Sequence, residues 1–229
     1  MAGGTPDREV LVFLKAPRSG EVKTRLAAEI GDDLAVEIYR GLTAEVLRAT
    51  EAAGSPTFSR IVCFAPRGAE EEIAAWLGDH HVLEPQSDGD LGARIEHAFA
   101  TSFARGSSKT VIVGTDSLSI DRAAVGSAFA SLDDADLVLR AAEDGGYTLI
   151  GLKQSQAALF TGIAWSTSLV LKETLARAAA RGLRAVVEGP DADIDTLEDL
   201  RKNWSRIRPC LDPQTIERVG QTAFFARPA

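Results

Sequence analysis

Short apolar runs rich in β-branched residues alternate along this chain with segments of helical periodicity, and this alternation constrains the fold most strongly. A continuous β-branched run is typical of a strand that is buried on both faces of a parallel sheet. The intervening segments keep one apolar face over several turns, as amphipathic helices do. Alternating strands and helices favour an α/β fold in which helices cover both faces of the sheet. The sequence therefore predicts a three-layer α/β/α sandwich.

The boundaries of the expected elements follow from these patterns. Strands are predicted at residues 10–14, 60–64, 81–83, 110–113, 136–139, 147–152 and 185–187. Helices are predicted at residues 34–52, 69–77, 91–105, 122–131, 167–181 and 197–207. The loop with Asp144-Gly145-Gly146 joins two apolar runs, and glycines in a short loop favour an antiparallel connection. We therefore expect a mixed, mainly parallel sheet.

The length and composition of the chain fit a single domain. Its 229 residues are 45% hydrophobic, which allows one sizeable core. We expect one domain over residues 1–229, with a core at about 9–207 and a last helix at about 213–224. Asp212-Pro213 indicates that helix, because a capping residue is followed by proline at the first helical position.

The composition also excludes several classes of protein. No apolar run approaches the ~20 residues that span a bilayer, and the first residues lack the basic and apolar parts of a signal peptide. Cys63 and Cys210 give neither a disulfide framework nor a C-x-x-C metal spacing. The formal net charge of −8 argues against a nucleic-acid surface, because phosphate backbones attract basic faces. We expect a cytoplasmic protein without a membrane span or a nucleic-acid partner.

A local excess of positive charge near the N-terminus is the first candidate site. The basic and turn-forming residues of FLKAPRSGEVKTRLA, at positions 13–27, are Lys15, Pro17, Arg18, Gly20, Lys23 and Arg25. Such cations bind phosphate oxygens, and the backbone N–H groups of a glycine-containing loop add further donors. The stretch is neither a Walker loop nor a G-x-G-x-x-G motif. A basic loop that is solvated and binds no ligand is the alternative explanation, and the pattern alone favours neither.

Acids follow the strand pattern at two places and form the second candidate site. Asp116 comes soon after a β-branched run, and ligands gather beyond the carboxyl ends of such strands. Asp193 and Asp195 stand ahead of a helix whose start is explained by a capping box of Thr196 and Asp199. Carboxylates such as Asp116 and Asp195 can hold Mg²⁺ or Mn²⁺, which would neutralise a diphosphate gripped by the basic loop. A capped turn is the alternative explanation of Asp116.

Two further stretches give weaker signals. In PQSDGDLGARIEHAF, at residues 85–99, Gly89 allows a ligand to approach the start of a helix, whereas Asp90 is explained equally well as its N-cap. In EDGGYTLIGL, at residues 143–152, Asp144 stands beside two glycines, and a plain hairpin turn explains it without any function.

Six stretches occur in an order that resembles the bacterial DUF2064 family. They are FLKAPRSGEVKTRLA, PQSDGDLGARIEHAF, VIVGTDSLSI, AAEDGGYTLIGL, IAWSTSLVLKETLARAAARGL and DIDTLEDL, and they fall within residues 9–201. The family is grouped with the glycosyltransferases of the GT-A nucleotide-diphospho-sugar transferase superfamily. Nucleotidyltransferases that make molybdenum cofactor dinucleotides and 2-phospholactate guanylyltransferases are more distantly similar. The resemblance implies a GT-A-like sandwich with its nucleotide over the first strand–helix loop.

The resemblance also implies roles for individual residues. The nucleotide side would be formed by Lys15, Pro17, Gly20, Lys23, Arg25, Gln86, Gly89, Asp90 and Arg94. The catalytic acids would be Asp116, Asp144 and Asp195, of which Asp116 and Asp195 match the positions of metal ligands. The side of the small-molecule acceptor, which the sequence does not identify, would be formed by Tyr147, Trp165 and Ser166.

The leading hypothesis is a metal-dependent glycosyltransferase that uses a nucleotide-diphospho-sugar with Mg²⁺ or Mn²⁺. A nucleotidyltransferase that moves a guanylyl or cytidylyl group from a nucleoside triphosphate to a phosphorylated acceptor needs the same residues. A protein that binds a nucleotide without turnover is the third hypothesis. The family usually reads G-[ST]-D-x-P at the metal strand, whereas no proline follows Asp116 here, and this departure favours the third hypothesis. The presence of all three acids favours an enzyme.

Overall fold

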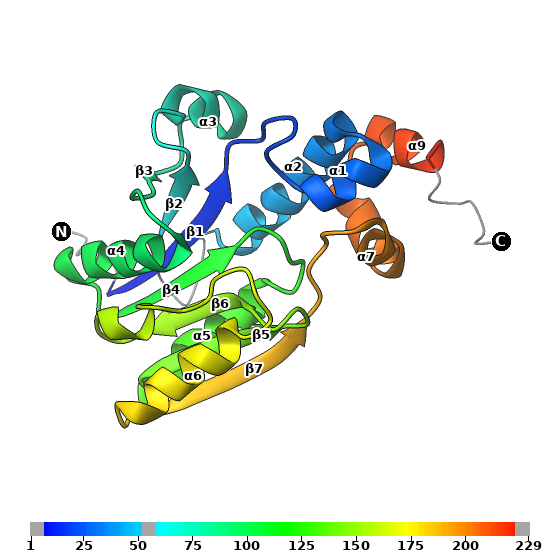
Figure 1. The fold of residues 1–229 in the computed structure, drawn as a ribbon. Helices are drawn as coiled ribbons and strands as arrows, with labels where there is room; N and C mark the ends of the chain where they lie inside the picture. Colours follow the sequence, from blue (N-terminus) through cyan, green and yellow to red (C-terminus); the bar gives the residue numbers. More distant parts are fainter. Residues whose placement is uncertain (1–6, 52–57, 223–229) are drawn as a thin grey trace.

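The computed structural model describes residues 7–51 and 58–222, in which seven strands form one sheet (Figure 1). The strand order is β3-β2-β1-β4-β6-β5-β7. Strand β6 runs antiparallel to β4 and to β5, and the other neighbouring pairs are parallel. The predicted mixed, mainly parallel sheet is therefore confirmed.

The bounds of the elements are as follows. The strands are β1 (Arg8–Lys15), β2 (Ser59–Ala65), β3 (Leu83–Pro85), β4 (Lys109–Gly114), β5 (Leu137–Ala142), β6 (Tyr147–Leu152) and β7 (Ala185–Asp191). The α-helices are α1 (Thr24–Ile30), α2 (Asp32–Ala49), α3 (Glu70–Leu77), α4 (Leu91–Ala104), α5 (Arg122–Asp134), α6 (Val170–Ala180), α7 (Leu197–Lys202), α8 (Trp204–Ile207) and α9 (Pro213–Gly220). The 3₁₀ turns are η1 (Ala157–Leu159) and η2 (Arg208–Cys210).

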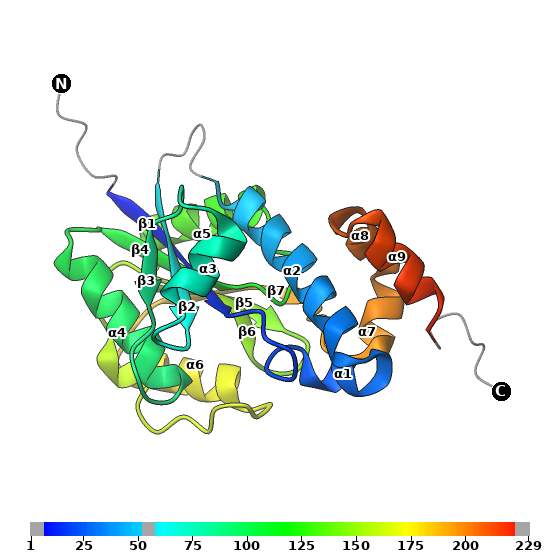
Figure 2. The same ribbon diagram turned by 90° about the horizontal axis from the view of Figure 1, so that it is seen from above.

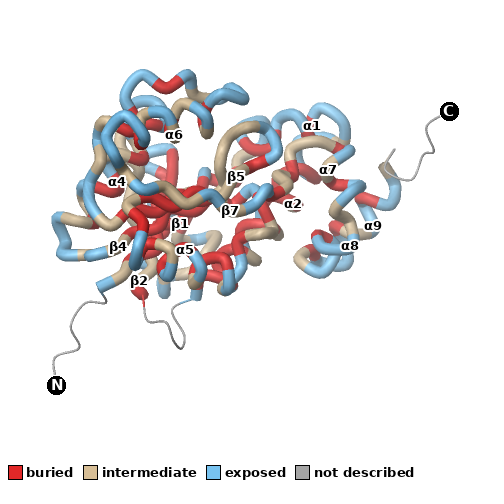
Figure 3. Tube along the Cα trace, turned by 90° about the horizontal axis from the view of Figure 1, so that it is seen from below, coloured by how far each residue is buried: buried red, intermediate tan, exposed pale blue. Residues whose placement is uncertain are grey.

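Helices cover both faces of the sheet (Figure 2). Alternate residues of a strand point to opposite faces, so Val10 and Val12 pack with α2, α3 and α5, whereas Leu11 packs with α4, η1 and α6. Both sets of side chains are buried, and the buried trace in Figure 3 follows the strands between the helical layers. The three-layer sandwich is therefore confirmed.

The C-terminal helices pack on helices rather than on the sheet. Helices α7 to α9 lie beside α1 and α2 (Figure 1). They share with α1 and α2 a third apolar cluster, which includes Leu26, Ile38, Leu200 and Val219. This cluster brings the segment before α7 back toward the loop that precedes α1. In the described part of the chain, no helix has the length and apolar character that crossing a membrane requires.

Several predicted boundaries differ from the observed ones. The predicted helix 197–207 is interrupted at Asn203, whose side-chain amide donates to the Asp199 carbonyl at 3.0 Å and competes with the helical backbone. The helix predicted from residue 167 begins at Val170, because the Thr167 hydroxyl bonds to the Ala164 carbonyl and forms a turn. The strand predicted at 81–83 lies at Leu83–Pro85.

Two further boundary differences concern helix ends. Helix α2 begins earlier than predicted and ends at Ala49, and the predicted end at residue 52 lies outside the described residues. Helix α9 ends at Gly220, and the predicted end at residue 224 also lies outside them. The apolar periodicity at both ends continues past the last helical residue, so it does not mark where the backbone leaves the helix.

Two glycines with different surroundings should respond in opposite ways to substitution by alanine. A Cβ at Gly151 would lie 2.7 Å from Val138 Cγ1 and 3.1 Å from Leu132 Cδ1. We expect Gly151→Ala to lower the free energy of unfolding by about 1–3 kcal/mol through overpacking. A Cβ at Gly126, within α5, meets nothing within 4 Å. Gly126→Ala should therefore raise the free energy of unfolding by up to about 1 kcal/mol, because alanine is the better helix former.

Urea unfolding of the two variants and the wild type measures both effects. An unchanged or higher unfolding midpoint in Gly151→Ala would contradict the packing explanation, and a lower midpoint in Gly126→Ala would contradict the expected gain in helix propensity.

Candidate active site

A cavity of about 450 Å³ opens at the carboxyl ends of the parallel strands β1 and β4. The two strands are in register, with Phe13 opposite Gly114, so that the residues after them reach the same edge of the sheet. Strand β6 begins at this edge because it runs antiparallel to β4. The cavity therefore occupies the place where ligands bind in open α/β sheets.

The structure brings about half of the predicted site residues onto the wall of this cavity. Those on the wall are Lys15, Lys23, Arg25, Gln86, Arg94, Asp116, Tyr147 and Asp195. Those outside the lining are Pro17, Gly20, Gly89, Asp90, Asp144, Trp165 and Ser166. The basic loop and the two predicted metal ligands thus share one cavity.

Asp116 and Asp195 meet because two loops are tied together by hydrogen bonds. Asp116 lies just after β4, and Asp195 lies just before the N-cap of α7. The Ile194 N–H donates to the Asp116 carbonyl at 3.1 Å, and the Ser117 hydroxyl donates to the Ala192 carbonyl at 3.1 Å. These bonds hold the two carboxylates near each other although their segments are far apart in the sequence.

The Lys23 ammonium joins these two carboxylates. Lys23 Nζ lies 3.0 Å from Asp195 Oδ1 and also forms an ion pair with Asp116 Oδ1. Burial opposes the charge of Lys23, but the attraction of Asp116 and Asp195 outweighs it and raises the pKa of Lys23 above its ordinary value. Desolvation likewise opposes the charge of Asp116, and the nearby Lys23 and Lys15 nevertheless lower the pKa of Asp116. Lys23 and Asp116 are therefore both charged at neutral pH.

Asp193 adds a third carboxyl to the same region. Its Oδ1 atom is buried and has no hydrogen-bond partner within the described part of the chain. Burial, followed by repulsion from Asp116, Asp144 and Asp195, raises the pKa of Asp193 to about 7. No function was predicted for Asp193, although its place two residues before Asp195 is the signal that could have marked it.

Tyr39 is a second residue that the sequence did not mark. Its hydroxyl accepts from the Lys15 N–H at 2.8 Å and donates to the Lys15 carbonyl at 3.1 Å. The Thr115 hydroxyl donates to the Tyr39 oxygen at 3.5 Å. Tyr39 thus links the end of β1 to the residue before Asp116. In the sequence it occupies a core position of an amphipathic helix, and nothing there distinguishes it from a packing residue.

Several residues that were predicted to lie on the nucleotide side form hydrogen bonds within the protein. The Gln86 amide nitrogen donates to the carbonyls of Leu14 and Cys63, at 3.2 and 2.8 Å, and so fixes the ends of β1 and β2. Asp90 is the N-cap of α4 and accepts from the backbone N–H of a first-turn residue at 2.9 Å, as its alternative explanation stated. Arg94 Nε donates to the Gly89 carbonyl at 3.0 Å while the Arg94 side chain lines the cavity.

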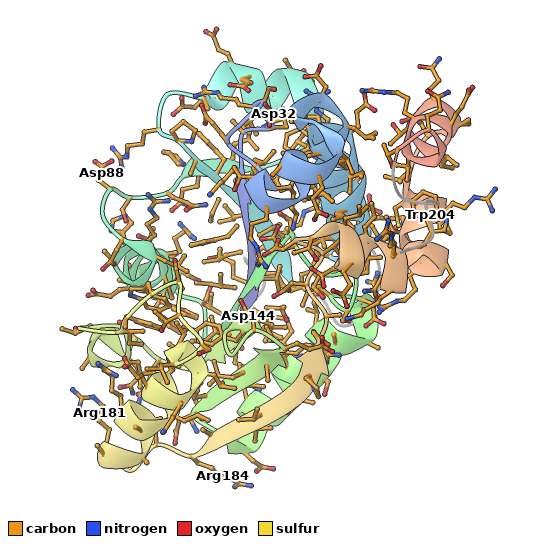
Figure 4. The ribbon with its side chains drawn as sticks, turned by 45° about the vertical axis from the view of Figure 1, so that its right-hand side comes forward. Asp32, Asp88, Asp144, Arg181, Arg184 and Trp204 are labelled. Carbon is orange, nitrogen blue, oxygen red and sulfur yellow. The ribbon has the colours of Figure 1, made fainter. Side chains whose placement is uncertain are left out.

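The predicted acceptor side lies around the β5–β6 turn. Asp144 is exposed on this turn (Figure 4), and its Oδ1 accepts from the Gly146 N–H at 2.8 Å, as in a plain hairpin turn. The indole of Trp165 packs against Gly92, where a Cβ would lie 2.5 Å from Nε1. Ser166 follows with a positive φ of 62°. The acceptor role of these residues stays a prediction.

The donor atoms of the site fit a hard divalent cation. The Oδ1 atoms of Asp116 and Asp195 contact the same ammonium group, so the two carboxylates lie close enough together to share a cation. Mg²⁺ and Mn²⁺ favour oxygen ligands, and Mg²⁺ commonly takes one or two carboxylates together with substrate phosphates. Across the described residues, no cluster of three or more acidic, histidine or cysteine ligands is present. The remaining ligands would therefore come from the substrate and from water.

Two solved structures of low sequence identity share this fold. The inositol-1-phosphate CTP transferase of T. maritima is 16% identical, with a TM-score of 0.55, over 97% of this chain and 100% of that chain. Rv0371c of Mycobacterium tuberculosis H37Rv, solved as a complex with manganese, is 16% identical, with a TM-score of 0.51, over 85% of this chain and 96% of that chain. Both likenesses concern the fold alone, and a third structure confirms the predicted nucleotide-diphospho-sugar transferase fold.

A third structure is more similar. A candidate nucleotide-diphospho-sugar transferase from Desulfovibrio desulfuricans G20 is 28% identical, with a TM-score of 0.82, over 97% of this chain and 94% of that chain. Among proteins with curated descriptions, none matches this sequence. The model of DUF2064, described as an uncharacterized protein conserved in bacteria, matches residues 47–167, which is more than half of the chain. This chain belongs to the DUF2064 family.

Proposed function

We propose that this chain is a metal-dependent glycosyltransferase that takes a nucleoside diphosphate sugar as its donor. The observation that carries the proposal is the meeting of Asp116 and Asp195 with Lys15 and Arg25 on one cavity at the strand ends. Carboxylates beside cations suit a diphosphate with a divalent cation bound to it. The similarity to the Desulfovibrio protein, 28% identity over 97% of this chain, supports this class of donor.

In this proposal the donor phosphates lie against the first strand–helix loop. Lys15 and Arg25 line the cavity there, and Arg94 lines it from α4. A guanidinium group binds phosphate oxygens with two hydrogen bonds and stays charged at any ordinary pH. These side chains orient the diphosphate and offset the negative charge that gathers on it as its bond to the sugar breaks.

The transfer step moves the sugar from the diphosphate to an acceptor. The acceptor oxygen bonds to the anomeric carbon and gives its proton to water, while the nucleoside diphosphate leaves with the electrons of the broken bond. A divalent cation held by Asp116 and Asp195 would supply Lewis-acid stabilisation of this leaving group. Tyr147, which lines the cavity at the start of β6, is proposed to contact the acceptor.

The charge of the cavity favours nucleotidyl transfer as a second candidate. The charged residues of the described lining are the cations Lys15, Lys23, Arg25 and Arg94 and the acids Glu21, Asp116 and Asp195. With a divalent cation the balance is clearly positive. A nucleoside triphosphate carries more negative charge than a diphosphate sugar, because its terminal phosphate can ionise twice. In this reaction an acceptor phosphate oxygen attacks the α-phosphorus and pyrophosphate leaves.

Donor binding tests the proposal and separates the two candidates. We expect a nucleoside diphosphate sugar with Mn²⁺ to stabilise the wild type, by ~2.7 kcal/mol at a hundred times its Kd, and EDTA to remove the effect. Asp116→Asn should lose the metal-dependent part, because an amide is a weaker ligand than a carboxylate. A thermal-shift panel of nucleoside triphosphates and diphosphate sugars, each with Mn²⁺, Mg²⁺ or EDTA, measures these effects.

Asp79→Asn is the matched control, because Asp79 is exposed after α3 and does not line the cavity. It should respond like the wild type. Stabilisation by triphosphates alone would support nucleotidyl transfer instead. The absence of any metal-dependent response would contradict the role of Asp116.

Tyr39 generates a separate prediction as a positioning residue. Tyr39→Phe leaves the Lys15 N–H without its hydroxyl acceptor, and we expect a loss of about 1–3 kcal/mol in the free energy of unfolding. Because the Lys15 backbone is then no longer fixed at the cavity edge, the Kd of the donor should also rise by about three- to tenfold. Calorimetric titration well below the melting temperature measures the Kd on folded protein.

Thr50→Val is the matched control for this prediction. The buried Thr50 hydroxyl donates to the Val46 carbonyl at 2.7 Å at the end of α2, and Thr50 does not line the cavity. This variant should lose stability without a change in the donor Kd. An unchanged donor Kd in Tyr39→Phe would show that Tyr39 contributes to stability and not to donor binding.

A further inference from the structure

The three charged groups at the centre of the site differ in their exposure. The Lys23 side chain is only 2% exposed, whereas the side chains of Asp116 and Asp195 are 55% and 41% exposed. Lys23 therefore lies behind the two carboxylates, and the carboxylates face the cavity. A ligand can reach the acids without displacing the ammonium.

The backbone at Lys23 keeps the ammonium in this place. Lys23 is the N-cap of α1 and has left-handed dihedral angles, φ 48° and ψ 40°. Such angles are uncommon for a residue with a side chain and persist only where the surrounding structure imposes them. An N-cap side chain usually accepts from a backbone N–H of the first helical turn, whereas the Lys23 ammonium can only donate and makes no such bond. Its side chain is directed to the acids instead.

We propose that Lys23 is a fixed internal counter-ion that sets the metal affinity of the site. The ammonium cancels part of the negative charge of Asp116 and Asp195, while the backbone bond from the Ile194 N–H to the Asp116 carbonyl ties their two segments together independently of Lys23. Two carboxylates with such a neighbour hold a divalent cation weakly on their own. The phosphates of the donor supply the missing negative ligands, so that cation and donor bind together. This inference deepens the proposed function and rests on it for the identity of the donor.

Two other roles for Lys23 predict different results when the residue is removed. If Lys23 only bound donor phosphates, its removal would weaken donor binding and leave the affinity for the free cation unchanged. If Lys23 only held the acids in place, its removal would let them separate and would weaken cation binding. The counter-ion role alone predicts that removal of Lys23 strengthens the binding of the free cation.

A calorimetric titration of the protein with Mn²⁺ alone tests the inference in the absence of donor and acceptor. An opposite charge at this range changes the proton affinity of a carboxylate by about ten- to a thousandfold. We therefore expect Lys23→Met to bind Mn²⁺ at least about tenfold more tightly than the wild type. Mn²⁺ should also raise the melting temperature of this variant by more than that of the wild type.

Arg25→Met is the matched control. It removes the same charge from the cavity wall, but Arg25 is exposed and forms no ion pair with Asp116 or Asp195. The change in Mn²⁺ affinity that Arg25→Met causes should be smaller than the change that Lys23→Met causes. Lys23→Gln removes the charge while keeping a hydrogen-bond donor, and it gives the same test if the methionine variant does not fold.

The results distinguish this inference from the proposed function. Equal or weaker Mn²⁺ binding in both Lys23 variants would overturn the counter-ion role, whatever the donor panel shows. Tighter binding supports the role even if no diphosphate sugar stabilises the protein, in which case only the proposed function fails.

Discussion

The buried ammonium of Lys23 is the interaction on which the charge balance of the site depends. It joins the loop after β1, the end of β4 and the segment before α7, through Asp116 and Asp195. An ammonium group that is removed from water is costly unless charged partners surround it. The three segments must therefore meet for Lys23 to be buried at all. The backbone bond from Ile194 to Asp116 strengthens the same junction.

Contacts between α7 and α1 support this junction. Lys23 caps α1, Asp195 immediately precedes the cap of α7, and the two helices contact each other. The Glu29 carboxylate accepts from the Leu197 N–H at 3.1 Å, so a side chain of α1 also binds the start of α7. Apolar packing between these helices thus places a cation and an acid at one point. The sheet contributes the second acid through the end of β4.

The sequence predicted those features that are local or periodic. Continuous β-branched runs marked the strands, and the glycines beside Asp144 marked the antiparallel connection between β5 and β6. The acids Asp116 and Asp195 could be picked out because each follows or precedes a recognisable element. These signals survive in a single sequence because they depend on neighbours along the chain.

Features that depend on long-range contacts could not be predicted in this way. The helix expected at 197–207 breaks at Asn203 because a side-chain amide competes with the backbone, whereas the apolar spacing continues through the break. Tyr39 has a core position in its helix, and its role arises from a strand end distant in sequence. Lys23 was recognised as basic, but only its depth behind the acids distinguishes a counter-ion from a phosphate ligand.

The counter-ion role has the same consequence for both candidate reactions. Each needs a cation whose free coordination positions are filled by substrate phosphates, and a site that bound the cation strongly alone would gain little from them. By thermodynamic reciprocity, a donor that strengthens cation binding is itself bound more strongly when the cation is present. A lysine placed behind the acids lowers the affinity for the free cation, so that the site fills mainly when cation and donor bind together. Glycosyl and nucleotidyl transfer then differ in the atom attacked and in the acceptor, and they share the charge balance set by Lys23.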